Sequence, residues 1–315
     1  MNLSKILLVV MLCYYFTFCF AQQQQVDSLL SEYHKCTVDS TKIDLSLHIA
    51  TSIISTDPRK SIYYGKLSLK LAQDINDNQR EVLAYETIGR GYQYLGDIRN
   101  SINNFNEAKI LINKLNDKAG LAYLNINIAF LFAYMENNNL AIEYYQKAIE
   151  YFSISTDFKG ECRCYINISD ALYNSNRIDE ALVYLQKAKK LSQKHNDYRN
   201  LFINTNFAEA YLKKNEYKLA KEYASLGIEE ATKQNNTYII SSNYLVFAKI
   251  SLAKNELKSA EKFARKGFYF AKQASLNKIL IESISILYQI LDKEKRVHKS
   301  FSLLHTKHVY QNVII

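Results

Sequence analysis

Three asparagines recur at nearly equal spacing along the chain, at Asn127, Asn167 and Asn206. An asparagine side chain carries a hydrogen-bond donor and an acceptor, so it can pair with the N–H and C=O groups of another polypeptide backbone. A regular row of such amides would hold an extended peptide without demanding a particular sequence. The pattern therefore predicts recognition rather than reaction, although the same amides could instead bond to neighbouring helices or to water.

Further side chains follow the same spacing and would surround this row. Aromatic residues gather near its first half, and charged residues gather near its second half. Aromatic rings offer a large contact area at low entropic cost, and arginine is frequent among the residues that dominate binding energy. We therefore predict a ligand-binding groove formed by Arg90, Tyr94, Tyr123, Asn127, Phe130, Tyr134, Arg163, Asn167, Asp170, Asn206, Glu209, Lys213 and Lys249.

The sequence contains no motif typical of a catalytic site. It lacks the serine motif G-x-S-x-G, a phosphate-binding glycine loop and the zinc motif H-E-x-x-H. His305 and His308 share one helical face, but His298 lies about two turns away, roughly 10 Å along a helix axis, so the three cannot hold one zinc ion. We expect no enzyme activity, no metal and no cofactor.

Composition restricts the elements that can position these residues. The chain has 315 residues, of which 48% are hydrophobic and 23% are charged, so it is too apolar to be disordered. Eight glycines and one proline are too few for the many tight turns of a β-sandwich, barrel or propeller. The composition predicts an all-helical protein.

Small residues recur about every 40 positions in three columns. The first column is Ser61, Ser101, Ala141, Ala181, Ala220, Ala260 and Ser300. The second, seven residues later, is Ser68, Ala108, Ala148, Ala188, Gly227 and Gly267. The third, which precedes the first by twelve residues, is Gly89, Ala129, Ser169, Ala208 and Ala248. Such columns indicate helix pairs that pack closely, with rings such as Phe105 filling the space between small residues.

Asparagine and aspartate recur between these segments, for example at Asn76, Asn116 and Asn176. Both residue types tolerate turn conformations and cap helices. Each repeat is therefore predicted to consist of a helix, a short turn, a second helix and a longer turn.

The pattern resembles the tetratricopeptide repeat, whose first helix carries bulky-x2-apolar-small-x2-aromatic and whose second carries small-x3-aromatic-x2-small. The best-fitting unit is Tyr85, Ile88, Gly89, Tyr92, Ser101, Phe105 and Ala108. The resemblance covers roughly residues 41 to 310. It implies an all-α, right-handed α-solenoid of about seven stacked antiparallel helix hairpins, with a concave groove that commonly binds peptides.

The chain departs from this family in three ways. Its period is 40 residues rather than the usual 34, no tryptophan occurs, and the proline near the end of the second helix is missing. Without that proline, we expect the second helix to extend and absorb the additional residues. The chain is thus similar to exported bacterial members with longer helices. A HEAT or armadillo array also has repeats of this length, but lacks the small-aromatic-small columns.

The first residues are typical of a secretory signal peptide. Lys5 precedes an apolar run from Ile6 to Phe20, and Cys19 and Ala21 are small residues at the positions that a signal peptidase requires. The alternative is an uncleaved membrane anchor, but the run is short of the roughly 20 residues that span a bilayer. We predict a signal peptide at 1–21, a capping helix within 22–40, the repeat domain at 41–310 and a tail at 311–315.

Charge and cysteine content narrow the class of partner. The net charge of +9 is a mild bias, and nucleic-acid binding would need those charges gathered on one face with stacking aromatics. Cys36, Cys162 and Cys164 remain after signal removal, and an odd number does not make a disulfide framework. We expect a protein or peptide partner, no nucleic acid and no stable membrane span.

These features favour an exported, periplasmic or secreted scaffold that binds an extended segment. The alternative is the sensory region of a bacterial signal-transduction regulator. Such regulators continue into a membrane helix, but the apolar stretch 279–291 is short and is interrupted by Glu282. A third hypothesis is a scaffold that self-associates through its outer or terminal faces.

Overall fold

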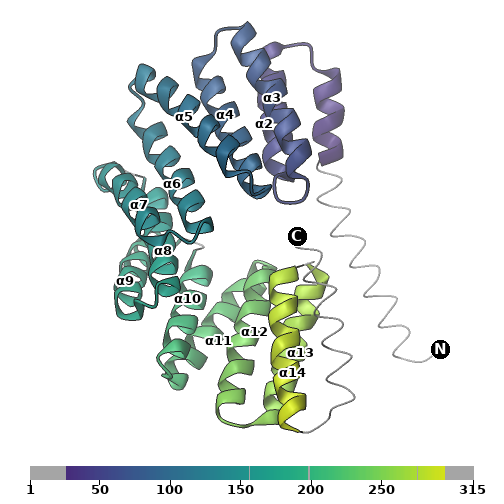
Figure 1. The fold of residues 1–315 in the computed structure, drawn as a ribbon, viewed down its shortest axis with the longest axis vertical. Coiled ribbons are helices and arrows are strands. Elements are labelled where there is room, and N and C mark those ends of the chain that lie inside the picture. Colours follow the sequence, from purple (N-terminus) through teal and green to yellow (C-terminus); the bar gives the residue numbers. More distant parts are fainter. Residues whose placement is uncertain (1–25, 156, 198, 275, 295–315) are drawn as a thin grey trace, which may run out of the picture. The chain divides into compact units, whose positions relative to one another are not determined.

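The computed structural model describes residues 26–155, 157–197, 199–274 and 276–294 (Figure 1). Within these ranges all regular structure is helical, and no helix is long and apolar enough to cross a bilayer. The predicted signal peptide at 1–21 and tail at 311–315 lie outside the described residues, as do Ser300, His298, His305 and His308.

The chain divides into two compact units, residues 1–160 and 161–315, and each is described by itself. The first unit begins with a helix over residues 26–35, inside the range predicted for the capping helix. Its further helices are α2 (Asp39–Ile53), α3 (Pro58–Asp74), α4 (Asn78–Tyr94), α5 (Ile98–Leu115), α6 (Lys118–Tyr134) and α7 (Asn138–Phe152).

The second unit starts within the first turn of α8. Its helices are α8 (Phe158–Asn174), α9 (Ile178–Lys194), α10 (Asn200–Lys213), α11 (Tyr217–Lys233), α12 (Thr237–Ala253), α13 (Leu257–Gln273) and α14 (Asn277–Lys293).

Successive helices form antiparallel hairpins, such as α4 with α5, α6 with α7 and α12 with α13 (Figure 1). The first helices of neighbouring hairpins also contact one another, so that α4 touches α6 and α10 touches α12. A first helix such as α4 therefore packs on its hairpin partner, on the second helix of the preceding hairpin and on neighbouring first helices. The predicted all-helical array of hairpins is confirmed.

The small-residue columns are helix-helix contacts, as the sequence predicts. Ser61, Ser101, Ala141 and Ala220 are completely buried, and the other described members of the three columns are buried as well. Close approach at these positions leaves no room for larger side chains. A Cβ atom added to Gly89 would lie 2.7 Å from the ring of Phe105, which is itself fully enclosed.

The turns are defined by left-handed residues followed by helix caps. Asn76, Asn116 and Asn176 have positive φ, the conformation that asparagine tolerates best among residues with a side chain. The aspartates that follow the first two accept hydrogen bonds from the first turn of the next helix. In the turn between α6 and α7 the left-handed residue is Glu136 and not Asn137, whose side chain caps α7 instead.

One expectation about the repeat was wrong, and a second holds at only some of the turns. The additional residues were expected in the second helix, but α12 and α13 each have 17 residues, so the first helix is as long as the second. The turns between hairpins were expected to be longer. Five residues separate α7 from α8 and α9 from α10, as expected, but residues 75–77 and 234–236 form turns as short as residues 95–97 within a hairpin. Left-handed asparagines reverse the chain in so few residues that a longer turn is unnecessary.

Steric contact between Gly89 and Phe105 gives a test of the packing. We expect Gly89→Val to lower the free energy of unfolding by about 1–3 kcal/mol, because the added methyl groups collide with the ring. In a Phe105→Ala background the same change should cost less, since the ring is gone and the two sites are coupled. Urea unfolding of the four variants measures both effects.

The matched control is Asn103→Val on the exposed side of α5. It introduces the same side chain into a helix and should change stability by no more than about 0.5 kcal/mol. If Gly89→Val and Asn103→Val lowered the free energy of unfolding equally, the close packing described for Gly89 would be contradicted.

Candidate functional site

In the first unit, the predicted ligand residues form two neighbouring stripes. Arg90 and Tyr94 lie four residues apart on α4, and the α6 residues recur at intervals of three or four, which places each set on one side of its helix. Leu83 and Glu86 complete the α4 stripe at the same spacing. The first-unit face comprises Leu83, Glu86, Arg90, Tyr94, Tyr123, Asn127, Phe130 and Tyr134.

Aromatic rings dominate the solvent side of this face. Tyr94 is 47% exposed, Phe130 is 48% exposed and Tyr134 is 58% exposed. The Tyr134 hydroxyl lies 3.7 Å from the point where a Cβ on Gly96 would be, so this ring reaches the α4–α5 turn. Exposed rings gathered on adjacent helices are typical of a binding surface.

Tyr123 is anchored more firmly than the other rings. Its ring packs edge-on against Phe152 with centroids 5.2 Å apart, and its hydroxyl donates a hydrogen bond to Asp157. These contacts fix the orientation of the ring before any ligand arrives, which lowers the entropic cost of binding.

Glu86 lies at the base of the first-unit face with one carboxylate oxygen unpartnered. Its Oε1 atom is buried and has no hydrogen-bond partner among the described residues. Burial raises its pKa to about 7, with Arg90 opposing the shift and Asp117 adding to it. Sequence reasoning missed Glu86, although its position four residues before Arg90 signals a shared helical face.

The second-unit face is formed by first helices as well. Arg163, Asn167 and Asp170 lie on α8, and Asn206, Glu209 and Lys213 lie on α10. Arg163 and Lys213 are exposed, while Asn167 is partly buried. The Asn206 side-chain amide donates a hydrogen bond to Asp170, so for this asparagine the alternative of bonding to a neighbouring helix holds.

Asp170 and Glu209 are carboxylates in crowded surroundings. Water reaches the Asp170 side chain, yet neighbouring helices displace much of its hydration, and this raises its pKa to about 7. The charge of Glu209 adds to the rise, and Lys278 opposes it. The pKa of Glu209 is also raised by burial, against the influence of Lys249.

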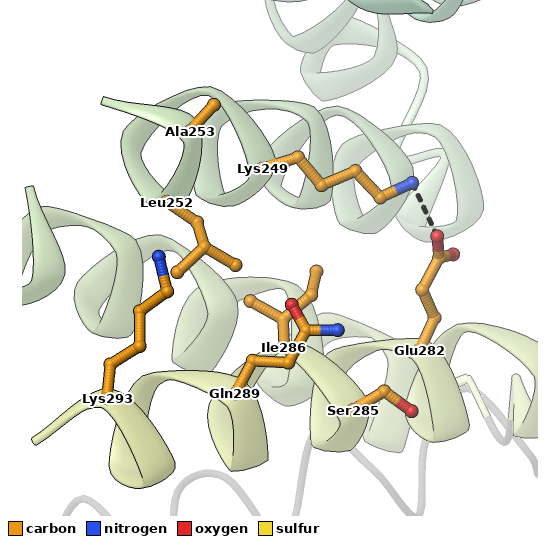
Figure 2. Close-up of a pocket in the computed structure, with 8 residues that line it drawn as sticks. All are labelled: Lys249, Leu252, Ala253, Glu282, Ser285, Ile286, Gln289 and Lys293. Carbon is orange, nitrogen blue, oxygen red and sulfur yellow. Dashed lines mark ion pairs between the residues drawn. The ribbon is translucent and has the colours of Figure 1, made fainter. Parts of the chain in front are cut away.

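A pocket lies farther along the second-unit face, between α12 and α14 (Figure 2). Its volume is about 430 Å³. The Lys249 ammonium forms an ion pair with Glu282 at 2.5 Å across one end, and Leu252 and Ile286 provide apolar walls. The remaining lining residues are Ala253, Ser285, Gln289 and Lys293.

The structure does not place all the predicted residues in one site. Asn127 belongs to the first unit, and Asn167 and Asn206 belong to the second. Glu282, which sequence reasoning missed, lies three repeat periods after Arg163 and could have been found by extending the register.

The cysteines have the character of structural residues. Cys162 and Cys164 are buried free thiols. Burial raises the pKa of Cys162 to about 11, so its reactive thiolate is scarce near neutral pH. Among the described residues, no group of three or more histidine, cysteine or acidic side chains could hold a metal ion.

Comparison with known proteins supports the repeat fold. Residues 122–153 and 163–195 match the sequence profile of the tetratricopeptide repeat. Among curated proteins, no sequence matches the chain.

Three solved structures illustrate the structural similarity. A Rap protein complexed with competence and sporulation factor has a TM-score of 0.70 at 13% identity. The match covers 93% of this chain and 80% of the Rap chain. Aspartyl phosphate phosphatase F from Bacillus subtilis has a TM-score of 0.68 at 15% identity, and the match covers 90% of this chain and 75% of the phosphatase chain. The apo form of the quorum sensor NprR from B. thuringiensis has a TM-score of 0.57 at 14% identity, and the match covers 98% of this chain and 99% of the NprR chain. At these identities the similarity shows the fold alone.

The raised pKa of Glu86 predicts a pH-dependent contribution to stability. In the folded state its pKa is about 7 against an ordinary value of 4.5, so its ionisation weakens folding progressively as the pH rises through this interval. Glu86→Gln cannot ionise, so we expect it to raise the free energy of unfolding at about pH 8 by on the order of 1 kcal/mol, with no gain at about pH 4. Chemical denaturation at both pH values measures this difference.

Glu150→Gln on α7 is the matched control, because Glu150 is exposed and its substitution changes the net charge by the same amount. The buried environment of Glu86 would be contradicted if Glu86→Gln raised the free energy of unfolding equally at both pH values, or by the same amount as Glu150→Gln.

Proposed function

We propose that the protein is a non-enzymatic scaffold that binds an extended peptide or protein segment along the first-helix faces of its repeats. The observation that carries this proposal is the concentration of exposed aromatic rings and amide side chains on one side of the first helices, where no hairpin partner covers them. Elsewhere the same helices use small residues to pack.

The two units would make different contributions to affinity. On the first-unit face, the rings of Tyr94, Phe130 and Tyr134 would cover apolar side chains of the ligand, and burial of such surface contributes about 25 cal/mol per Å². On the second-unit face, Asn167 and the charged side chains around it would bond to polar groups. A ligand that presents apolar side chains to the first-unit face and polar groups to the second-unit face fits this division.

Two of the three similar structures support ligand recognition, whereas the third is named as a phosphatase. One of them is a complex with competence and sporulation factor, and another is described as a quorum sensor. Catalysis by Cys162 is disfavoured because its thiol is buried and protonated. No nucleic-acid partner is proposed.

The second candidate function is that of a sensory region in a bacterial signal-transduction regulator. The similarity to NprR, which extends over nearly the whole of both chains, favours it. Reading the coding sequence downstream of residue 315 distinguishes the two, since an in-frame apolar stretch of about 20 residues would indicate a membrane-anchored sensor.

Export to the periplasm or the medium, with cleavage after Ala21, is part of the proposal. Mass spectrometry of the N-terminus of the protein from its native envelope tests it, and an intact Met1 would contradict it. Self-association remains a further proposal, which light scattering over a range of concentrations tests.

The asparagine row gives the mutational test of peptide binding. A library of short unstructured peptides is selected on the immobilised protein, and the bound peptides are measured by calorimetry. We expect Asn127→Ala/Asn167→Ala/Asn206→Ala to raise the Kd about tenfold or more, because each lost hydrogen bond contributes about 0.5–1.5 kcal/mol. Circular dichroism should remain that of the unchanged protein.

The control removes asparagines from the second helices, as Asn103→Ala/Asn139→Ala, where both side chains are exposed. This variant should bind as the unchanged protein does. If no peptide binds the unchanged protein, the proposed function is wrong. If binding occurs but the triple variant retains it, the asparagines do not contact the ligand.

A further inference from the structure

The outer side of α13 carries a continuous row of basic side chains. The 17 residues of this helix include five cations and one acid, whereas α11, the equivalent helix of the preceding hairpin, has three of each. The strong positive charge is therefore not shared by the neighbouring hairpin. This row, the α13 stripe, consists of the exposed residues Lys258, Lys262, Arg265, Tyr269 and Lys272.

Helical geometry keeps these side chains together. Members of the α13 stripe follow one another at intervals of four, three, four and three residues, so they share one side of the helix. At a rise of about 1.5 Å per residue, the row extends about 21 Å from Lys258 to Lys272. Tyr269 lies within the row and is 39% exposed. The stripe is thus a straight line of charge that includes one aromatic ring.

The opposite side of α13 holds the stripe in place. Buried on that side are the small residues Ala260, Ala264, Gly267 and Ala271. A Cβ atom added to Gly267 would lie 2.8 Å from the side chain of Leu245 on α12. Such close packing fixes the rotation of α13 about its axis, because any other rotation would press larger side chains against α12. The small residues that build the repeat therefore also direct the stripe outward.

The single acid of α13 does not neutralise the stripe. Glu261 forms an ion pair with Arg265 at 2.6 Å, and the Arg265 side chain is still 65% exposed. Water and salt screen a pair this exposed, so it leaves the charge of the stripe largely in place. The sequence of α13 offers no further acid to the three lysines of the stripe. The stripe therefore attracts negative charge from outside the helix.

The chemistry of the stripe suits a lipid surface better than a protein partner. The centre of a protein interface is apolar and depleted of lysine. On α13 the apolar rings turn inward, since Phe263 stacks on Phe247 with centroids 5.1 Å apart and Phe270 stacks on Tyr244 with centroids 5.8 Å apart. The outer side presents cations and the ring of Tyr269. Tyrosine is enriched where a membrane meets water, at the level of the lipid headgroups.

We propose that the α13 stripe is a docking surface for anionic lipid headgroups, through which the protein attaches to a membrane surface. Charge complementarity supplies the attraction, and each cation near such a surface strengthens binding by about fivefold. A second copy of the chain docked through the same stripe is disfavoured, because the two rows of cations would repel each other. The inference goes beyond the proposed function, since peptide binding uses first helices and α13 is a second helix.

The test uses an introduced tryptophan, because the chain has none of its own. Tyr269→Trp places this fluorophore in the stripe. Tyr238→Trp on α12 is the matched control, since Tyr238 is 51% exposed and lies near Glu209 and Asp170 of the second-unit face. Both full-length variants are mixed with vesicles made of equal parts phosphatidylglycerol and phosphatidylcholine. The phosphatidylcholine is brominated on its acyl chains, and bromine quenches tryptophan fluorescence on contact.

We expect the anionic vesicles to quench the fluorescence of Tyr269→Trp and to leave that of Tyr238→Trp unchanged. Vesicles of brominated phosphatidylcholine alone should quench neither variant, because they carry no net charge. Adding about 0.5 M salt should abolish the quenching of Tyr269→Trp, since ions at this concentration screen exposed charges over a few ångströms.

Charge variants in the Tyr269→Trp background measure the contribution of the stripe. Lys262→Gln/Arg265→Gln/Lys272→Gln should raise the apparent Kd for anionic vesicles on the order of 100-fold, at about fivefold for each cation. The control removes three exposed cations from α11 of the same unit and should raise the Kd by less than about fivefold. This control is Lys218→Gln/Lys221→Gln/Lys233→Gln, which changes the net charge by the same amount.

The docking surface would be refuted if anionic vesicles failed to quench Tyr269→Trp, quenched Tyr238→Trp equally, or bound the stripe variant as tightly as the α11 control. Soluble polyglutamate gives a further arm of the experiment. If polyglutamate binds in a manner that requires the stripe and anionic vesicles do not bind, the partner is an acidic polypeptide and the assignment to lipid is wrong.

Discussion

Close approach of helix backbones at small residues is the constraint on which the rest of the structure depends. At Gly89, Ser101 and Ala108 one helix lies so near the next that a single ring, Phe105, fills the remaining space. The same geometry recurs every 40 residues and fixes which side of each first helix is packed. The side left unpacked can carry rings, amides and charges, because the contacts between helices are made on the other sides of each first helix.

Much of the fold could be predicted from the sequence, because its determinants are local and repeated. The columns identify the buried side, and asparagines such as Asn76 and Asn176 mark the turns through their tolerance of positive φ. The exception at Glu136 was not predictable, since glutamate has no preference for that conformation. The equal lengths of the two helices were missed because the absence of a stop signal does not say which helix extends.

The candidate site was less predictable, because its character comes from distant residues. The spacing of the repeats alone predicted that Asn206 and Asp170 belong to the groove. The hydrogen bond between them depends on the packing of α8 against α10. The lack of a partner at Oε1 of Glu86 is likewise a property of its surroundings. A sequence shows a carboxylate at a position, whereas only the fold shows that neighbouring helices remove its water and supply no partner.

The location of the bound ligand tests the central claim most directly. Photo-crosslinking with p-benzoylphenylalanine, introduced at Phe130 on α6 or at Ile110 on α5, samples the two sides of one hairpin stack with exposed positions of comparable size. The account predicts that a peptide selected on the protein crosslinks at Phe130 and not at Ile110. Crosslinking from Ile110 alone would show that the ligand lies against the second helices and would contradict the account.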